Sequence, residues 1–178
     1  GSMGDCNFRH FYENLLAAAV PVRVVEWYQK LIRMVGWKLS AMAPASSAIS
    51  NLIMSDQGKQ DVRRSNCCVM DCGRQGVRLY FYQKGLLFAK RGLEFCDTEE
   101  RLLFELEKIW DYYQTCYPGY IPELIYVTGG KRNPLLEAAI TEQLEAECCD
   151  WTKLLDNSQE PVRGLISAEA AGITFWKG

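Results

Sequence analysis

Two glycine turns that follow apolar segments hold the residues whose types best suit ligand chemistry. The first apolar segment, residues 67–72, contains Asp71 and is followed directly by Gly73. The second apolar segment runs into Gly129 and Gly130. Backbone N–H groups in glycine turns at the carboxyl ends of strands commonly bind phosphate, and a carboxylate beside such a turn can face a metal ion that the phosphate carries. The two turns together are therefore a candidate phosphate site.

Ordinary turn chemistry explains the same residues equally directly. Asp and Gly are frequent where a strand gives way to a turn, because Asp caps the backbone and Gly tolerates unusual dihedral angles. Residue types alone favour this structural role for Asp71. A Thr-Gly-Gly sequence at 128–130 is likewise more typical of a tight turn than of an adenosine-binding site. The sequence leaves both interpretations open.

The apolar segments around the first turn predict an antiparallel meander of three strands, at residues 67–72, 77–83 and 86–91. The intervening residues, 73–76 and 84–85, contain the glycines that hairpin turns require. The first segment is apolar almost throughout, which is typical of a central strand covered on both faces. The first candidate turn therefore follows a central strand.

Segments with helical spacing alternate with apolar runs after the meander. Asp97 is the expected N-cap of a long helix, and Glu100 three residues later completes a capping box. Pro118-Gly119 ends this helix, whose stripe of leucine and aromatic residues is typical of core packing. The remaining expected elements are a strand at 121–128, a helix that begins at Asn133-Pro134, a strand or strand and turn at 148–155, and a small-residue helix at 165–176.

The chain before the meander shows a change of composition. Gly1-Ser2 is typical of the remnant of an expression tag, which predicts a fragment of a longer protein. Residues 55–65 are polar and charged and predict a linker or a domain boundary. The expected organisation has three parts: a tag remnant with an irregular N-terminus at 1–13, a βαβα segment of a preceding subdomain at 14–58, and a C-terminal subdomain at 66–178. In the βαβα segment, strands are expected at 14–20 and 37–43, and helices are expected to start at Pro21 and Pro44.

Composition narrows the classes of function. The 178-residue chain has a net charge of −2, so it lacks the basic excess that a nucleic-acid-binding surface normally needs. Its eight cysteines include two adjacent pairs but no C-x-x-C spacing, and His10 is the only histidine, so we expect free thiols in a reducing compartment and no metal site. We expect neither a signal peptide nor a membrane helix, because the sequence contains no apolar run near the ~18 residues that a membrane helix requires.

The order of the expected elements predicts the fold. Three antiparallel strands, a helix, a parallel strand, a helix, a further strand and a closing helix give the βββαβαβα order of a ribonuclease-H-like, or actin-like ATPase, half domain. This is an α/β fold with a mixed sheet and flanking helices. In such a fold the two candidate turns lie at strand ends, where phosphates are commonly bound.

Short sequences in the same order also resemble a known family. The chain contains V-M-D-C-G, L-L-F-A-K-R-G, E-L-E-K-I-W-D-Y-Y, I-P-E-L-I-Y-V-T-G-G and A-E-A-A-G-I. Their order and spacing are similar to those of the C-terminal half of the PilM family, the actin-like cytoplasmic component of type IV pilus assembly, and residues 14–53 are similar to the piece that precedes it there. The compact form, in which Phe95 is followed almost at once by the long helix, is more similar to the pilus-biogenesis protein MshI and to the cytoplasmic domain of the secretion protein GspL.

The resemblance implies a non-enzymatic scaffold of a type IV pilus or type II secretion platform. Such a protein would be cytoplasmic and peripheral to the inner membrane, held there through its partners. It would bind the N-terminal tail of a PilN-like membrane protein, with a pilus motor ATPase as a further partner. Actin-like ATPases have small residues after the strand aspartate, whereas this chain has Arg74 and Gln75 between its glycines. We therefore expect no nucleotide hydrolysis, no catalytic residue and no cofactor in this chain.

Two alternatives use the same fold. In the first, the full-length protein binds ATP with Mg²⁺, with Asp71, Gly73 and Arg74 near the phosphates and Gly129-Gly130 near the adenosine. In the second, the chain is a ribonuclease-H-like nuclease with Asp71 as a metal-binding carboxylate. Two-metal chemistry needs several converging acids, and the ends of the second and fourth predicted strands carry none. The nuclease is therefore the least favoured interpretation.

Overall fold

The computed structural model describes residues 20–39, 42–55, 60–94, 98–155 and 168 of the chain. The chain divides into two compact units, residues 1–44 and residues 45–178. This division falls inside the 14–58 segment, whose assignment to a preceding subdomain stays a prediction.

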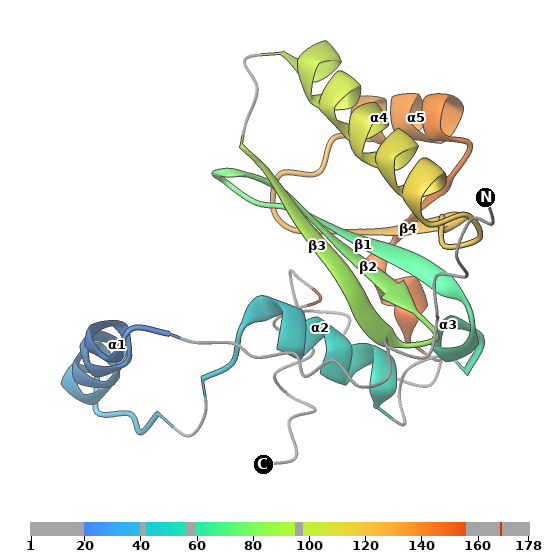
Figure 1. Cartoon of the computed structure of the whole chain (residues 1–178). Coiled ribbons are helices and arrows are strands. Elements are labelled where there is room, and N and C mark those ends of the chain that lie inside the picture. The colour runs from blue at the N-terminus through green and yellow to red at the C-terminus, as the bar shows by residue number, and fades with distance from the viewer. Residues whose placement is uncertain (1–19, 40–41, 56–59, 95–97, 156–167, 169–178) are drawn as a thin grey trace, which may run out of the picture. The chain divides into compact units, whose positions relative to one another are not determined.

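A five-stranded mixed sheet forms the centre of the second unit (Figure 1). Its strands are β1 (Asn66–Cys72), β2 (Gly76–Gln83), β3 (Leu86–Glu94), β4 (Leu124–Thr128) and β5 (Glu147–Asp150). They lie in the order β3-β2-β1-β4-β5; the pairs β1–β2 and β2–β3 are antiparallel, whereas β1–β4 and β4–β5 are parallel. Six of the seven residues of β1 are buried, as its apolar sequence predicts for a central strand. The predicted meander and mixed sheet are confirmed.

Two glycine hairpins hold β1, β2 and β3 in register. Between β1 and β2, the Gly73 N–H donates to the Gly76 carbonyl at 3.0 Å. Gly76 has a φ of 150°, and a Cβ at this position would overlap the Leu93 carbonyl oxygen, so a larger residue does not fit. Between β2 and β3, Lys84 and Gly85 have φ values of 48° and 78°, which suit the twist of a two-residue hairpin.

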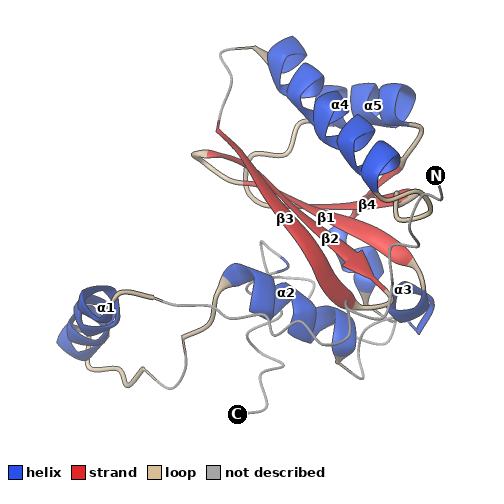
Figure 2. Cartoon of the chain, in the orientation of Figure 1, coloured by secondary structure: helices blue, strands red, loops and turns tan. Residues whose placement is uncertain are grey.

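Helices cover both faces of the sheet (Figures 1 and 2). On one face lie α4 (Glu99–Cys116) and α5 (Pro134–Leu144), and on the other lie α2 (Ala45–Met54) and the short 3₁₀ helix η2 (Trp151–Leu154). Successive side chains of β1 alternate between the two cores, since Cys68 and Met70 join the α4–α5 side whereas Cys67 and Val69 join the α2 side. The central strand is therefore packed on both faces.

The long helix α4 is capped by Thr98. The Thr98 hydroxyl accepts a hydrogen bond from the Arg101 N–H at 3.3 Å. The predicted capping box of Asp97 and Glu100 is therefore wrong; Glu100 lies in the first turn, where a carboxylate is stabilised by the helix dipole. The predicted apolar stripe is confirmed, and its buried members are Leu102, Leu103, Leu106, Trp110 and Tyr113.

The elements after α4 follow the predicted order. The Asn133 side chain caps α5 by accepting from the Leu135 N–H at 3.0 Å, and Pro134 is its first residue. β5 continues directly into η2, as the predicted strand and turn require. Ala168 is the one described residue of the predicted 165–176 helix, and it is helical and fully buried. The rest of that predicted helix lies outside the described residues.

Two predictions for the residues before β1 are wrong. The predicted linker contains a short helix, α3 (Gln60–Arg64), and Val62 within it is only 4% exposed. A single buried residue gives no helical period, so the sequence has the character of a linker. In the predicted strand at 37–43, the described residues are not part of a strand. The predicted strand at 14–20 lies outside the described residues, apart from Val20, which is not in a strand.

The described part of the first unit is a helix and its flanking residues. α1 (Val22–Met34) starts directly after Pro21 and ends before Gly36, whose φ of 76° stops it. The predicted helix is confirmed. Trp27 and Trp37 are 58% and 70% exposed.

The described cysteines are free thiols. Burial raises the pKa of Cys67 and of Cys72 to about 12, so both are protonated at neutral pH. Among the described residues, no three His, Cys, Asp or Glu side chains are grouped as a metal site would require. None of the helices in the described ranges has the length and apolar character needed to cross a membrane.

Candidate functional site

Asp71 lies next to last in β1, at the centre of the candidate site. It is 7% exposed, and its neighbours in register are Arg78 on β2 and Thr128 on β4. The Arg78 Nη1 atom lies 3.4 Å from Asp71 Oδ2, in an ion pair whose arginine side chain is half exposed. The carboxylate is therefore already matched by a positive charge from its own sheet.

The second turn packs directly against the first. Gly129 has a φ of 95°, and a Cβ at this position would lie 2.5 Å from the Cys72 carbonyl oxygen and 2.8 Å from Asp71 Oδ1. The Lys131 N–H donates to the same Cys72 carbonyl at 3.0 Å. Only glycine allows both the positive φ and this close approach. The structure thus brings Asp71 and Gly129 together, as the parallel pairing of β1 and β4 predicts.

The first turn uses its backbone donor internally. The Gly73 N–H is bonded to the Gly76 carbonyl and closes the hairpin. Arg74 and Gln75 between these glycines are exposed. A cradle for phosphate needs several N–H groups that point at the anion, and here the Gly73 donor is directed across the hairpin instead.

An arginine beside the second turn completes this edge of the sheet. Arg132 donates through Nε and Nη2 to Glu137 Oε1 and Oε2, each at 2.9 Å, and through Nη1 to Asp150 Oδ2. These hydrogen bonds to Glu137 and Asp150 raise the pKa of Arg132 above its ordinary value, against the opposing effect of burial. The guanidinium is therefore held by two carboxylates of the chain rather than presented to an external anion.

Asp150 has a second set of partners at the start of η2. Its Oδ1 accepts from the Thr152 N–H at 2.9 Å and from the Thr152 hydroxyl at 2.6 Å. Burial works against ionisation, but the hydrogen bonds from Thr152 and Arg132 together hold the pKa of Asp150 below its usual value. The Arg132 cluster is not evident from the sequence. Glu137 lies five residues away in the chain, whereas no local signal links Arg132 to Asp150.

Thr128 is the last residue of β4 and directly precedes the second glycine turn. It is fully buried, and its hydroxyl oxygen accepts from the Ala168 N–H at 2.8 Å. The end of β4 therefore anchors the helical backbone at residue 168, and Thr128 has a structural role.

The two turns do not fit a magnesium-bound phosphate as they stand. A fit would require a carboxylate free to face the metal ion and donors directed at the anion. Asp71 instead pairs with Arg78, the Gly73 N–H closes its own hairpin, and Gly129 packs over the carboxylate.

Comparison with known proteins identifies the fold. No family model matches the chain, and no curated protein matches it. A solved structure of a PilM-PilN type IV pilus biogenesis complex superposes with a TM-score of 0.63 at 15% identity, covering 83% of this chain and 56% of that chain. The chain has the actin-like ATPase fold. The predicted ribonuclease-H-like order is thus confirmed.

Two further structures share this likeness. The ethanolamine utilization protein EutJ from Carboxydothermus hydrogenoformans has a TM-score of 0.50 at 12% identity, over 78% of this chain and 60% of that chain. A Bacteroides thetaiotaomicron protein of unknown function with an actin-like ATPase fold has a TM-score of 0.43 at 14% identity, over 58% and 38%. This chain spans 56% of the PilM-PilN structure and 60% of the EutJ structure. At these low sequence identities the likeness shows the fold alone.

Proposed function

We propose that the chain is a non-enzymatic actin-like scaffold of a type IV pilus or type II secretion assembly platform at the inner membrane. In this role it lies on the cytoplasmic side and binds the tail of a PilN-like membrane protein, with a pilus motor ATPase as a second partner. The structural likeness to a PilM-PilN complex supports the choice of partner. The resemblance of the short sequences to PilM supports it independently.

The state of Asp71 carries the non-enzymatic part of the proposal. In a working nucleotide site this carboxylate would face a metal ion. Here the ion pair with Arg78 and the packing of Gly129 occupy it from two sides. Binding Mg-ATP would require the Asp71 carboxylate to leave Arg78 and the turn at Gly129 to withdraw, and both changes oppose the native packing.

ATP binding is the second candidate function. It is supported by the contact between the two glycine turns, since Gly129 packs against Asp71 and Cys72. Arg74 is exposed in the first turn and its guanidinium suits a phosphate. In this alternative, Asp71, Gly73 and Arg74 contact the phosphates and Gly129-Gly130 contact the adenosine.

Isothermal titration calorimetry of the full-length protein with Mg-ATP separates the two functions. The scaffold predicts no saturable heat, and it predicts saturable binding of a peptide that carries the cytoplasmic tail of a PilN-like protein. Asp71→Asn, with its fold checked by circular dichroism, leaves the peptide affinity unchanged. Glu142→Gln, at an exposed position of α5, is the control for loss of one negative charge.

Two results would contradict the scaffold proposal. Saturable Mg-ATP binding that is lost in Asp71→Asn but kept in Glu142→Gln would establish the nucleotide site. Failure of the tail peptide to bind at concentrations up to the millimolar range would remove the PilN-like partner.

A further inference from the structure

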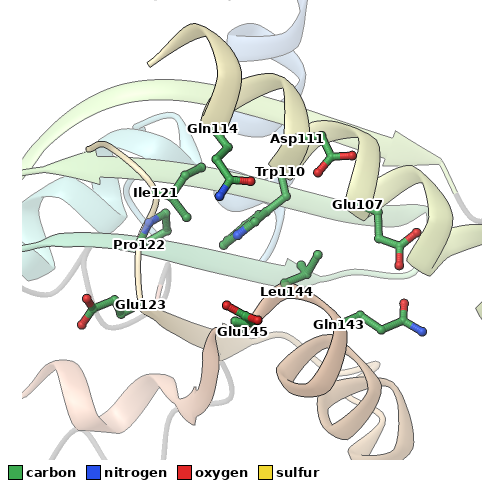
Figure 3. Close-up of a pocket in the computed structure, with 10 residues that line it drawn as sticks. All are labelled: Glu107, Trp110, Asp111, Gln114, Ile121, Pro122, Glu123, Gln143, Leu144 and Glu145. Carbon is green, nitrogen blue, oxygen red and sulfur yellow. The ribbon is translucent and has the colours of Figure 1, made fainter. Parts of the chain in front are cut away.

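A groove between α4, α5 and the residues that lead into β4 is lined with carboxylates (Figure 3). Glu107 and Asp111 line it from α4, Glu123 lies just before β4, and Glu145 lies at the C-terminal end of α5. The groove has a volume of about 490 Å³, and the described residues that line it include no Lys, Arg or His. Within the described part of the chain, none of these four carboxylates is paired with a basic side chain.

The local geometry strengthens the negative potential of the groove. Glu107 and Asp111 are four residues apart on one helix, where like charges repel each other. The C-terminal end of α5 lines the groove, and its last turn has no basic residue to offset the negative end of the helix dipole. Glu145 adds a carboxylate to that end. A cation in the groove would be stabilised by all of these charges.

Trp110 adds an unpaired hydrogen-bond donor to the lining of the groove. Its side chain is 4% exposed, and its Nε1–H has no acceptor within hydrogen-bond distance in the described residues. Figure 3 shows the indole extending from α4 into the groove between Ile121 and Leu144. Buried indole N–H groups usually have an acceptor because an unpaired donor is costly. The groove therefore presents one buried donor as well as its carboxylates.

We propose that this groove binds a basic segment of a partner protein in an extended conformation. A Lys or Arg side chain of that segment pairs with Glu107, Asp111 and Glu123, while one of its main-chain carbonyls accepts from Trp110 Nε1. A peptide supplies both groups, whereas a polyamine has no acceptor for the indole and a nucleic acid is repelled by the carboxylates. The proposal does not depend on the scaffold function, because it uses neither glycine turn nor any likeness to a pilus protein.

Fluorescence anisotropy of the whole chain with a labelled octapeptide of alternating Lys and Ala tests the proposal. We expect saturable binding that the double variant Glu107→Gln, Asp111→Asn weakens about tenfold or more, since hydrogen bonds to charged groups are lost. The double variant Glu26→Gln, Glu142→Gln removes the same charge at exposed positions outside the groove. It should change the dissociation constant less than about twofold, because neither of these side chains lines the groove and exposed charges are screened by salt.

The indole N–H resonance of Trp110 provides a readout that general charge attraction would not move. Its cross-peak in a ¹H–¹⁵N spectrum is the one that Trp110→Phe removes, and peptide should shift it downfield in the native chain. An unsaturable titration, an equal loss of affinity in both double variants, or an unmoved Trp110 resonance at saturation would each overturn the proposal. Spermidine that competes as well as the peptide would overturn it too, in favour of a small-cation site.

Discussion

Replacing Gly129 with alanine tests the contact between the two glycine turns most directly. Gly129 has a φ of 95°, and its Cβ would lie 2.5 Å from the Cys72 carbonyl oxygen and 2.8 Å from Asp71 Oδ1. The nearer atom belongs to the backbone of the central strand, so the turn after β4 must move. Gly130 is the matched control, because a Cβ there would meet no atom within 4 Å.

The expected loss of stability combines three effects. An alanine at positive φ costs about 1 kcal/mol relative to glycine, and crowding in a packed region costs about 1–3 kcal/mol. If the turn withdraws to relieve the crowding, the hydrogen bond from Lys131 to Cys72 is lost at about 1 kcal/mol. Withdrawal of the turn relieves part of the crowding, so the two costs do not simply add. Gly129→Ala should therefore lower the free energy of unfolding by about 3 kcal/mol. Gly130→Ala should change it by less than about 1 kcal/mol.

Urea unfolding followed by circular dichroism measures this difference. With a slope of about 2 kcal/mol per molar urea, Gly129→Ala should lower the midpoint by about 1.5 M and Gly130→Ala by less than about 0.5 M. Adding Asp71→Ala removes only one of the three close contacts, and the other two are with the Cys72 backbone, so it should rescue less than half of the loss in a double-mutant cycle. Similar midpoints for the two glycine variants, or full rescue by Asp71→Ala, would refute the reasoning.

Three further predictions concern elements on which sequence and structure differ or which the sequence does not reveal. Thr98→Ala should destabilise the protein by about 1 kcal/mol through loss of the α4 cap, measured by urea unfolding against Thr115→Ala at an exposed position of the same helix. Val62→Ala should lower the free energy of unfolding by about 1–2 kcal/mol, because Val62 is buried. No change in stability would indicate that α3 does not pack on the core and acts as a linker. The pKa of Asp150 is lowered by folding, so its stabilising contribution is present above the unfolded value of about 4 and is lost as pH falls through the folded value. The midpoint temperature of thermal unfolding should therefore fall less steeply between pH 6 and pH 2.5 in Asp150→Asn than in the native chain. Equal slopes would contradict this prediction.

Local signals explain the parts of the fold that the sequence predicts. The hairpins are predictable because Gly76 and Gly85 are required by the backbone of their own turns. The central strand is predictable because β1 is buried on both faces and its sequence is correspondingly apolar. The parallel pairing of β1 with β4 then follows from the order of elements, and it places Asp71 beside the second turn.

The parts that the sequence does not reveal depend on contacts between distant residues or on choices between neighbours. Asp97 and Thr98 are both good helix caps, and only the backbone conformation selects Thr98. The pairing of Arg132 with Asp150 joins residues 18 positions apart. Asp71 at the end of β1 is visible in the sequence, but its ion pair with Arg78 depends on the strand register.

The same limit applies to the acidic groove. The spacing of Trp110 in α4 predicts core packing, and the ring does pack against Phe81, with ring centroids 5.7 Å apart. The unpaired state of its N–H depends on Ile121 and Leu144, which come from other elements and offer no acceptor. Periodicity can predict that a side chain is buried, but it carries no information on hydrogen-bond partners.

Helix α5 joins the two regions of interest as a short rigid rod. It begins at Pro134, a few residues after the second glycine turn, and its last residue, Leu144, lines the acidic groove. Its 11 residues span about 16 Å, and hydrogen bonds along the axis make such a helix stiff in compression and tension. The acidic groove and the hydrogen bond between Lys131 and Cys72 therefore lie near opposite ends of one continuous helix.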